Sequence, residues 1–355
     1  MKILHVSSAI TWRGGEQQIA YLMDEVEVLG HQQFLLCPTN SALSNYAKEK
    51  GFSIIEFVKR SSINFSAAKD LKKTATEHQI DLIHMHDSHA HTIGVLAASL
   101  FGLNCPLVLN RRVDFPIKKN IFSRWKYNHT SIKKILCVSE NIANVIKHDI
   151  NDINKIKVVH SGIDASKFKF SNSNILRQEY QISPKTILIG NVASVADHKD
   201  YFTFVDTAEI LIKEDLEFKF FIIGNDGGQF EEIKNYIQSK GLDEFIIMTG
   251  YRNDIPKILP ELNLFLFTSK LEGLGTSILD AFASKIPVVA TNAGGVPEMV
   301  KHEQTGLLSN IRNPIDLAMN VKRLLKEEEL KINCVQNAFD SLEHFTKKAM
   351  ALKTV

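Results

Sequence analysis

The sequence predicts an α/β protein of two doubly wound domains, each a parallel sheet with helices on both faces. Three observations support this class. Short apolar runs alternate with helix-length stretches along all 355 residues, which is the order of βαβ units. The runs are almost wholly apolar, as strands buried on both faces are. There are thirteen of them, which is many for one open sheet.

Seven strands are expected in the first half of the chain. Each is a run rich in Val, Ile, Leu and Phe between polar or Gly-containing stretches. They are residues 2–7, 34–37, 53–57, 81–86, 106–110, 134–139 and 156–161. The stretches between them carry apolar residues at helical spacing, as in residues 16–30.

Six further strands are expected in the second half. They are residues 186–193, 218–224, 245–250, 262–269, 286–291 and 306–309. A helical pattern follows at 316–329 and again at the end of the chain. The join between the domains is expected near 165–183, which is polar, rich in Ser and Asn, and poor in strand pattern. This organisation gives domains at 1–165 and 166–335, followed by a helical segment at 336–355.

Composition indicates a globular protein with room for two cores. Apolar residues make up 44% and charged residues 23% of the chain. No apolar run reaches the roughly 20 residues of a membrane-spanning helix. The N-terminus predicts a first strand rather than a signal peptide. The four cysteines are scattered without C-x-x-C spacing, which favours reduced thiols and a cytoplasmic protein.

The charge is unevenly distributed between the two halves. Residues 1–170 hold 22 Lys and Arg against 15 Asp and Glu, whereas the remainder is acidic. The excess gathers in residues 117–134, which have six basic residues, no acid, and interleaved aromatics. Such a segment can lie on an anionic membrane surface, contact an acidic acceptor, or form a solvated face. No nucleic-acid-binding motif is present, and we expect no nucleic-acid partner.

The strongest functional signal lies between residues 268 and 300. The apolar run 262–267 is followed by a loop and a helix start: Glu272, Gly273, Leu274, Gly275, Thr276 and Ser277. Free N–H groups and the helix dipole attract an anion to such a place, and the two hydroxyls can bond it as well. Glu272 and Asp280 can only accept hydrogen bonds, so they suit hydroxyl groups on either side of a phosphate. A nucleotide sugar has this chemistry.

This segment resembles the donor-binding signature of retaining glycosyltransferases with the GT-B fold, family 4 type. In that family two acidic residues stand eight positions apart. The resemblance implies that Glu272 contacts the transferred sugar and Asp280, where Glu is usual, the ribose. Asp keeps the charge but has a shorter reach. It also implies two Rossmann-like domains facing across a cleft, with the C-terminal helix crossing back over the first domain.

Two further turns match positions that bind donor phosphates in this family. Gly14 and Gly15 follow the first strand and open a helix, where paired glycines allow close approach of a ligand. Lys199 matches a lysine that grips the diphosphate, and its charge can offset the leaving group. Ser194 stands where the family usually has an arginine, which removes one expected cation.

Two residues near the ends of strands are catalytic candidates whose structural alternatives stay open. The segment 84–91 holds four histidines, and His86 is the one expected to face the cleft; a packed histidine is the alternative. No cysteine or carboxylate set completes a zinc pattern, so no metal site is expected. Arg112 could hold an acceptor phosphate or support the diphosphate. A structural pair with Asp114 is its alternative.

The sequence therefore predicts an enzyme that transfers sugar from a UDP- or GDP-sugar to a glycan or lipid-linked acceptor. It is expected to need no metal or other cofactor, because protein cations and helix dipoles neutralise the diphosphate. Bacterial surface polysaccharide or lipopolysaccharide assembly is the setting implied by the resemblance, at the inner face of the cell membrane. A nucleotide-sugar epimerase and a two-lobed sugar-binding protein share the architecture and remain alternatives.

Overall fold

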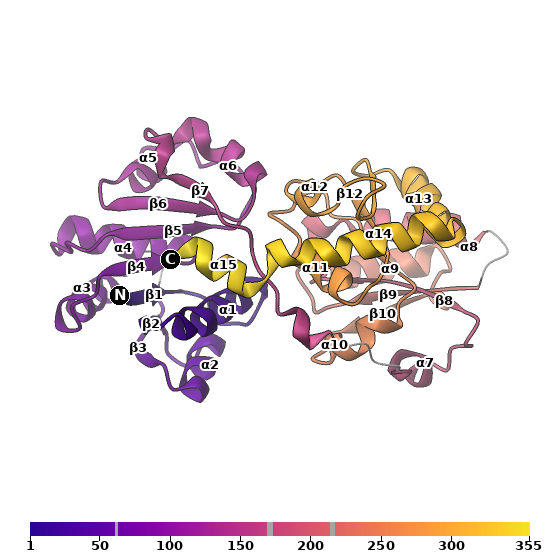
Figure 1. Cartoon of the computed structure of the whole chain (residues 1–355), viewed down its shortest axis with the longest axis horizontal. Coiled ribbons are helices and arrows are strands. Elements are labelled where there is room, and N and C mark those ends of the chain that lie inside the picture. The colour runs from indigo at the N-terminus through magenta and orange to yellow at the C-terminus, as the bar shows by residue number, and fades with distance from the viewer. Residues whose placement is uncertain (61–62, 169–172, 214–216) are drawn as a thin grey trace. The chain divides into compact units, whose positions relative to one another are not determined.

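The computed structural model describes residues 1–60, 63–168, 173–213 and 217–355. The chain forms two compact units (Figure 1). Unit 1 comprises Met1–Gly162 together with Thr346–Val355, and unit 2 comprises Ile163–Phe345. Each is a parallel sheet with helices packed on it, so the predicted α/β class is confirmed. Thirteen strands occur in the described residues, one at each predicted position.

Unit 1 has a seven-stranded parallel sheet in the order β3-β2-β1-β4-β5-β6-β7. The strands are β1 (Lys2–Val6), β2 (Gln32–Pro38), β3 (Ser53–Phe57), β4 (Leu82–Met85), β5 (Leu107–Arg111), β6 (Ile132–Cys137) and β7 (Ile156–Val158). The helices are α1 (Gly14–Val28), α2 (Ala42–Lys50), α3 (Phe65–Glu77), α4 (Ser88–Leu100), α5 (Ile121–Asn128), α6 (Glu140–Ile146) and α15 (Lys347–Thr354).

Unit 2 has a six-stranded parallel sheet in the order β10-β9-β8-β11-β12-β13. The strands are β8 (Ile187–Val192), β9 (Phe218–Ile223), β10 (Ile246–Gly250), β11 (Leu264–Phe267), β12 (Val288–Thr291) and β13 (Leu307–Ser309). The helices are α7 (Ile175–Glu179), α8 (Tyr201–Ile212), α9 (Phe230–Ser239), α10 (Ile255–Ile258), α11 (Thr276–Ala283), α12 (Val296–Met299), α13 (Pro314–Lys326) and α14 (Glu328–Ser341).

The order of strands reverses once in each sheet. In unit 1 the chain runs outward from β1 through β2 to β3 and then returns to place β4 on the other side of β1. In unit 2 the same reversal places β11 beside β8. Ligands of doubly wound sheets bind beyond the carboxyl ends of the strands at this switch point. The loops after β1 and β4, and those after β8 and β11, are therefore the places to search for function.

The unit boundary differs from the sequence-based division. It falls between Gly162 and Ile163 rather than after residue 165. The returning segment starts at Thr346, not at 336, because α14 still belongs to unit 2. In unit 1, α15 packs with α1 over the sheet, where Met350 joins a buried apolar cluster. Part of the predicted linker, residues 169–172, lies outside the described residues.

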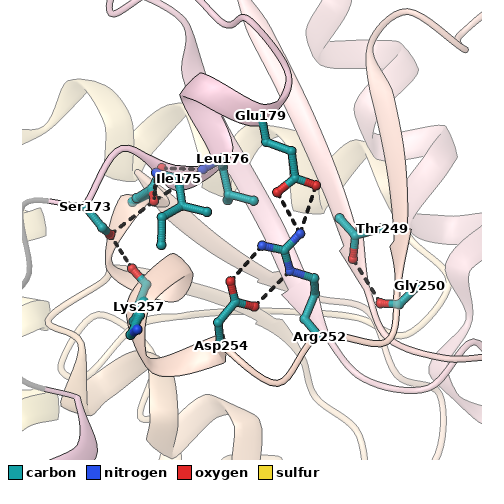
Figure 2. Close-up of polar contacts among 10 residues, drawn as sticks. Ser173, Ile175, Leu176, Glu179, Thr249, Gly250, Arg252, Asp254 and Lys257 are labelled. Carbon is teal, nitrogen blue, oxygen red and sulfur yellow. Dashed lines mark hydrogen bonds and ion pairs between the residues drawn. The ribbon is translucent and has the colours of Figure 1, made fainter.

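A polar network attaches the short helix α7 to unit 2 (Figure 2). The Arg252 guanidinium donates to both carboxylate oxygens of Glu179, at 2.9 and 2.7 Å. It also forms a two-bond fork with Asp254, at 2.8 and 2.7 Å. At the other end of α7, Glu261 accepts from the N–H groups of Ile175 and Leu176. The first residues of unit 2 are thus held by side chains that follow β10.

Among the described residues, no helix has both the length and the apolar character that crossing a bilayer demands.

Candidate active site

In unit 2 the loops after β8 and β11 are hydrogen-bonded to each other at the switch point. The Thr268 hydroxyl donates to the Lys199 carbonyl at 3.1 Å, and the Lys270 N–H donates to the His198 carbonyl at 2.9 Å. The backbone turns at Asp200, whose φ of 52° is left-handed, and α8 follows. These bonds fix the Lys199 backbone beside the loop that carries Glu272.

Lys199 and Glu272 form an ion pair within this loop region. Each side chain is 14% exposed, so the pair is partly desolvated yet still reaches solvent. The Ser269 hydroxyl donates to the same Glu272 carboxylate at 3.3 Å, and the Lys199 ammonium lies 5.2 Å from the Phe267 ring centroid. The structure therefore brings together two residues that the sequence separates by more than seventy positions. A cation and an acceptor stand side by side where a ligand is expected.

Helix α11 begins shortly after this pair, at Thr276, and Gly275 is the N-cap residue before it. This residue has φ 91°, which a side chain would strain, and an added Cβ would lie 3.3 Å from the Glu272 and Phe267 side chains. No side chain caps the helix start. Its first N–H groups are therefore available to an anion, with the half-exposed Thr276 and Ser277 beside them. Buried Gly273 and Leu274 carry the loop into the helix without adding charge.

Asp280 lies one turn further along α11 and is partly buried. Burial raises the pKa of its carboxyl to about 7, and the nearby Lys167 opposes the shift. Among the residues that the structure describes, the Asp280 carboxyl has no hydrogen-bond partner. A ligand hydroxyl would supply one and would favour the ionised form.

In unit 1, Gly14 and Gly15 open α1 after the β1 loop, as the sequence suggested. A Cβ at either position would meet no atom within 4 Å, so this turn borders open space. The Glu16 carboxylate accepts from the Arg13 N–H at 2.9 Å, and burial raises the pKa of Glu16 while Arg112 opposes the rise. The start of α1 therefore already has a carboxylate, that of Glu16, in its first turn.

Arg112 points to the same side of unit 1 as Glu16. Burial lowers the pKa of its guanidinium to about 10, and Glu16 acts in the opposite direction. The Arg112 Nε is buried without a hydrogen-bond partner. Within the described part of the chain Arg112 makes no ion pair with Asp114, so the structural alternative is not found. A guanidinium with a buried unsatisfied donor suits a ligand anion.

His86 does not face open space as the sequence analysis expected. It is 4% exposed, and its Nε2 lies 3.0 Å from the His5 Nδ1. Gln33 donates to the Met23 carbonyl and so accepts from the His5 Nε2 with its oxygen, at 3.0 Å. His5 therefore presents a bare Nδ1, which accepts from the His86 N–H. Burial and neighbouring histidines hold the pKa of His86 well below its usual range, so it is a neutral packed residue.

His5, His84 and His86 are the group of described residues able to hold a metal ion, with ligand atoms within 4.8 Å of one another. A metal would need the lone pairs that now form the His5–His86 hydrogen bond. Of the three histidines, His84 has a ring nitrogen, Nε2, that is buried without a hydrogen-bond partner and could act as a metal ligand. That no metal is required therefore stays a prediction.

Sequence reasoning missed three residues that shape the site. Phe267 and Ser269 support the Lys199–Glu272 pair, and Lys270 pairs with Asp197 at 2.7 Å. Their position at the end of β11 or directly after it was the available signal. What the sequence could not supply was the direction of each side chain.

Two family models match the chain, and together they cover most of it. Residues 12–167 match "Glycosyltransferase Family 4", and residues 172–341 match "Glycosyl transferases group 1". One relative is the UDP-Gal:alpha-D-GlcNAc-diphosphoundecaprenol alpha-1,3-galactosyltransferase of Escherichia coli, which is 26% identical over 98% of this chain and 95% of the relative. Another is the O-antigen biosynthesis glycosyltransferase WclY of Escherichia coli, 23% identical over 87% of this chain and 86% of that protein.

The fold has close counterparts among solved structures. HepE of Anabaena, solved in complex with UDP and glucose, superposes with a TM-score of 0.86 at 20% identity, covering 100% of this chain and 98% of HepE. At that identity the likeness establishes the fold. The matches to the two family models show in addition that the chain is a glycosyltransferase, and the matched residues include Lys199 and Glu272. This chain is therefore a glycosyltransferase of the GT-B fold and belongs to family 4.

Proposed function

We propose that the enzyme transfers a sugar from a UDP-sugar to a lipid-linked glycan with retention of anomeric configuration. The observation that carries the proposal is the Lys199–Glu272 pair at the switch point, beside the uncapped start of α11. The bound UDP of HepE and the UDP-Gal in the name of the Escherichia coli relative favour a uridine donor over a GDP-sugar. The name of the same relative also supports an acceptor on a polyprenol diphosphate.

The proposed roles follow from charge and position. Lys199 and the N–H groups at Thr276 and Ser277 stabilise the diphosphate as negative charge builds on it. Glu272 accepts hydrogen bonds from sugar hydroxyls, and Asp280 accepts from the ribose. When the donor binds, its diphosphate replaces part of the Glu272 contact with Lys199. The cations of the protein then neutralise the diphosphate, and no metal is assigned to the site.

Retention would arise from attack on the face that the leaving group vacates. The bond between the anomeric carbon and the diphosphate oxygen breaks, and the acceptor oxygen bonds to the same carbon. The acceptor proton passes to the departing phosphate oxygen. No base from the protein is needed in this scheme, which is consistent with the burial of His86 and with its lowered pKa, since both make it a poor proton acceptor. Arg112 is assigned to binding a phosphate, not to proton transfer.

Substitution of Glu272 tests the proposal. The substrates would be UDP-glucose or UDP-galactose and a polyprenyl-diphosphate-linked N-acetylglucosamine, with UDP release and product anomer measured by enzyme-coupled assay and NMR. Glu272→Gln should reduce transfer at least a thousandfold, about 4 kcal/mol of transition-state stabilisation, while the protein stays folded at a melting temperature lowered by the loss of the Lys199 ion pair. Glu231→Gln on exposed α9 is the matched control.

Two outcomes would overturn the proposal. Full activity of the Glu272→Gln variant would remove its central residue. Isomerised donor after incubation without any acceptor would identify an epimerase. An inverted product would reject retention but leave the donor site intact.

The proposed setting is the assembly of bacterial surface polysaccharide. WclY acts in O-antigen biosynthesis by its name, and a lipid-linked acceptor would bring the enzyme to a membrane surface. Segment 117–134 of unit 1 is the proposed point of contact. A thermal-shift screen with UDP-, GDP- and ADP-sugars would show which nucleotide raises the melting temperature.

A further inference from the structure

A pocket of about 300 Å³ lies in unit 1, and neither Glu16 nor Arg112 is among the residues that line it. It is bordered by the start of α4, the segment after β5, and α5. We call it the cation pocket and define it by Ser88, Thr92, Arg111, Lys118, Lys126 and Tyr127. Three of these six residues are cations. Among the described residues that line the pocket there is no Asp or Glu.

Arg111 ends β5, and its guanidinium contacts Tyr127 of α5, whereas the next residue, Arg112, interacts with Glu16 of α1. It is 7% exposed. Its guanidinium donates to the Tyr127 hydroxyl at 2.5 Å and to the Phe115 carbonyl, and stands over both aromatic rings. Its Nε is buried without a partner. In the part of the chain that the structure covers, no carboxylate pairs with this charge.

Lys126 lies on α5 and is 6% exposed. Its ammonium donates to the Ser88 carbonyl at 3.2 Å, to the Ser88 hydroxyl at 3.4 Å and to the Thr92 hydroxyl at 3.2 Å. All three acceptors are neutral. Burial lowers the pKa of Lys126 to about 8, and Arg111 adds to the shift. Two buried cations thus share one pocket.

The nearest acid does not compensate these charges by direct contact. Asp87 acts on Lys126 only at longer range. Its carboxylate accepts from the Ser8 N–H at 2.6 Å and the Ser8 hydroxyl at 2.6 Å, and also caps the start of α4 through His89 and Ala90. Buried charges in proteins are almost always paired, because an unpaired one is costly. An anion from outside would complete this pocket.

We propose that the cation pocket binds the phosphate or diphosphate of a lipid-linked acceptor; the lipid-linked source rests on the proposed function. Apolar side chains flank the pocket and suit the lipid. Phe115 is 54%, Ile121 88% and Trp125 39% exposed, and Phe122 stacks near Trp125 with ring centroids 5.5 Å apart. A phosphate held by two buried cations beside exposed apolar residues matches the junction between a headgroup and its chain.

Two other lysines of the basic segment have different surroundings. Lys133 and Lys134 are exposed, and their ammonium groups donate to the backbone carbonyls of Thr130 and Asn154. They are a solvated face of the kind that the charge run alone suggests. Lys126 is distinguished from them by burial and by its shared environment with Arg111. The pocket, rather than the run as a whole, is therefore the specific site.

The first test is calorimetric titration of the full chain with sodium pyrophosphate in the presence of saturating UDP, which keeps the unit 2 site filled. Wild type should bind, and Lys126→Met should weaken binding at least tenfold. Lys133→Met is the matched control and should bind as wild type does. Without ligand, Lys126→Met should keep or raise the melting temperature, because it removes an unpaired buried charge. A destabilised variant, or one that binds unchanged, would reject the pocket.

The second test identifies the source of the phosphate with vesicles. Flotation would compare phosphatidylcholine vesicles containing a polyprenyl diphosphate with vesicles of equal charge containing phosphatidylglycerol. Preferential capture by the polyprenyl diphosphate, lost in Lys126→Met but kept in Lys133→Met, supports the proposal. Equal capture by both vesicles would show a membrane-surface contact and overturn it. UDP-sugar binding, measured in the same samples, separates failure of this pocket from failure of the proposed function.

Discussion

The two carboxylates of the proposed donor site, Glu272 and Asp280, have different surroundings, and we therefore expect them to behave differently. Glu272 is paired with Lys199, so its charge is balanced before any ligand arrives. Asp280 has no such partner among the described residues, and burial raises its pKa to about 7. An acid in that state changes its charge near neutral pH. Its behaviour on binding a donor is therefore measurable.

We expect UDP-sugar affinity to depend on pH through Asp280. Ribose hydroxyls donate to the ionised carboxylate, so binding favours loss of the proton and strengthens as pH rises through about 7. Between pH 6 and 8 the dissociation constant should fall about tenfold. Calorimetry with UDP-glucose or UDP-galactose in buffers of different ionisation enthalpy would measure the shift and the released proton.

The control for this expectation is Asp280→Asn, which should bind more weakly but without the slope. The unliganded protein should also lose stability as pH rises from about 4 to 7, because the fold favours the protonated acid. With solvent contact allowed for, the loss is about 2 kcal/mol. A slope that persists in the Asn variant would assign the titration to another group.

The place of an individual residue in the site could be predicted where that residue follows the end of a strand. Glu272 and Lys199 each follow a buried strand, and strand ends at a switch point converge. His86 also follows a strand, but its packing depends on His5 and Gln33 from other strands, which no local pattern shows. Lys126 was part of an apparent surface run; its burial arises from the contact of α5 with α4.

At the scale of elements, the strands were predicted best because burial on both faces leaves an unbroken apolar run. All thirteen strands of the described residues fall within or overlap the predicted ranges. The ends of the strands were predicted less accurately. The strand predicted at 156–161 stops at Val158, because the chain then leaves the sheet towards the unit boundary. The predicted linker is polar because α7 is held by ionic contacts in addition to its one buried apolar residue, Leu176.

That ionic attachment gives a prediction for α7. Arg252→Ala would leave Glu179 and Asp254 without their shared partner, and Arg252 is only 17% exposed. We expect unit 2 to lose about 1–3 kcal/mol of stability, with faster amide exchange in α7. Urea unfolding followed by hydrogen exchange and mass spectrometry would measure both.

Arg252→Lys separates geometry from charge in this network. Lysine keeps the charge but cannot form the fork with Asp254 and also reach Glu179, so most of the loss should remain. Arg177→Lys, which alters an arginine bonded only to backbone carbonyls within the same helix region, is the comparison. Recovery of full stability in Arg252→Lys would show that charge alone holds α7.

For the whole molecule, the decisive feature is that the chain passes between the two units twice. The passages lie side by side, because the Ile163 N–H donates to the Phe345 carbonyl at 2.8 Å. Gly162 is required there, since a Cβ would lie 2.5 Å from the Thr346 carbonyl oxygen. Gln18 binds both backbone groups of Gly162, at 2.8 and 2.9 Å. The last ten residues thus complete unit 1 from the far end of the sequence.

This arrangement predicts that the C-terminal segment stabilises unit 1 without affecting unit 2. Met350 is 6% exposed in a cluster with Leu22 and Leu136, and Lys347 pairs with Glu25 at 3.2 Å. Met350→Ala should cost unit 1 about 2–4 kcal/mol through the cavity it leaves. Hydrogen exchange should rise in β1 and α1, whereas β8 and β11 should keep their protection.

Leu352→Ala is the matched control, because Leu352 is 56% exposed on the same helix and its loss should cost little. Both variants should bind UDP-sugar nearly as wild type does, since Lys199, Glu272 and Asp280 lie in unit 2, to which α15 does not belong. Equal loss of protection in both sheets would show that the units unfold as one body. Because only the buried methionine changes the cluster, a difference between the two variants isolates packing from helix propensity.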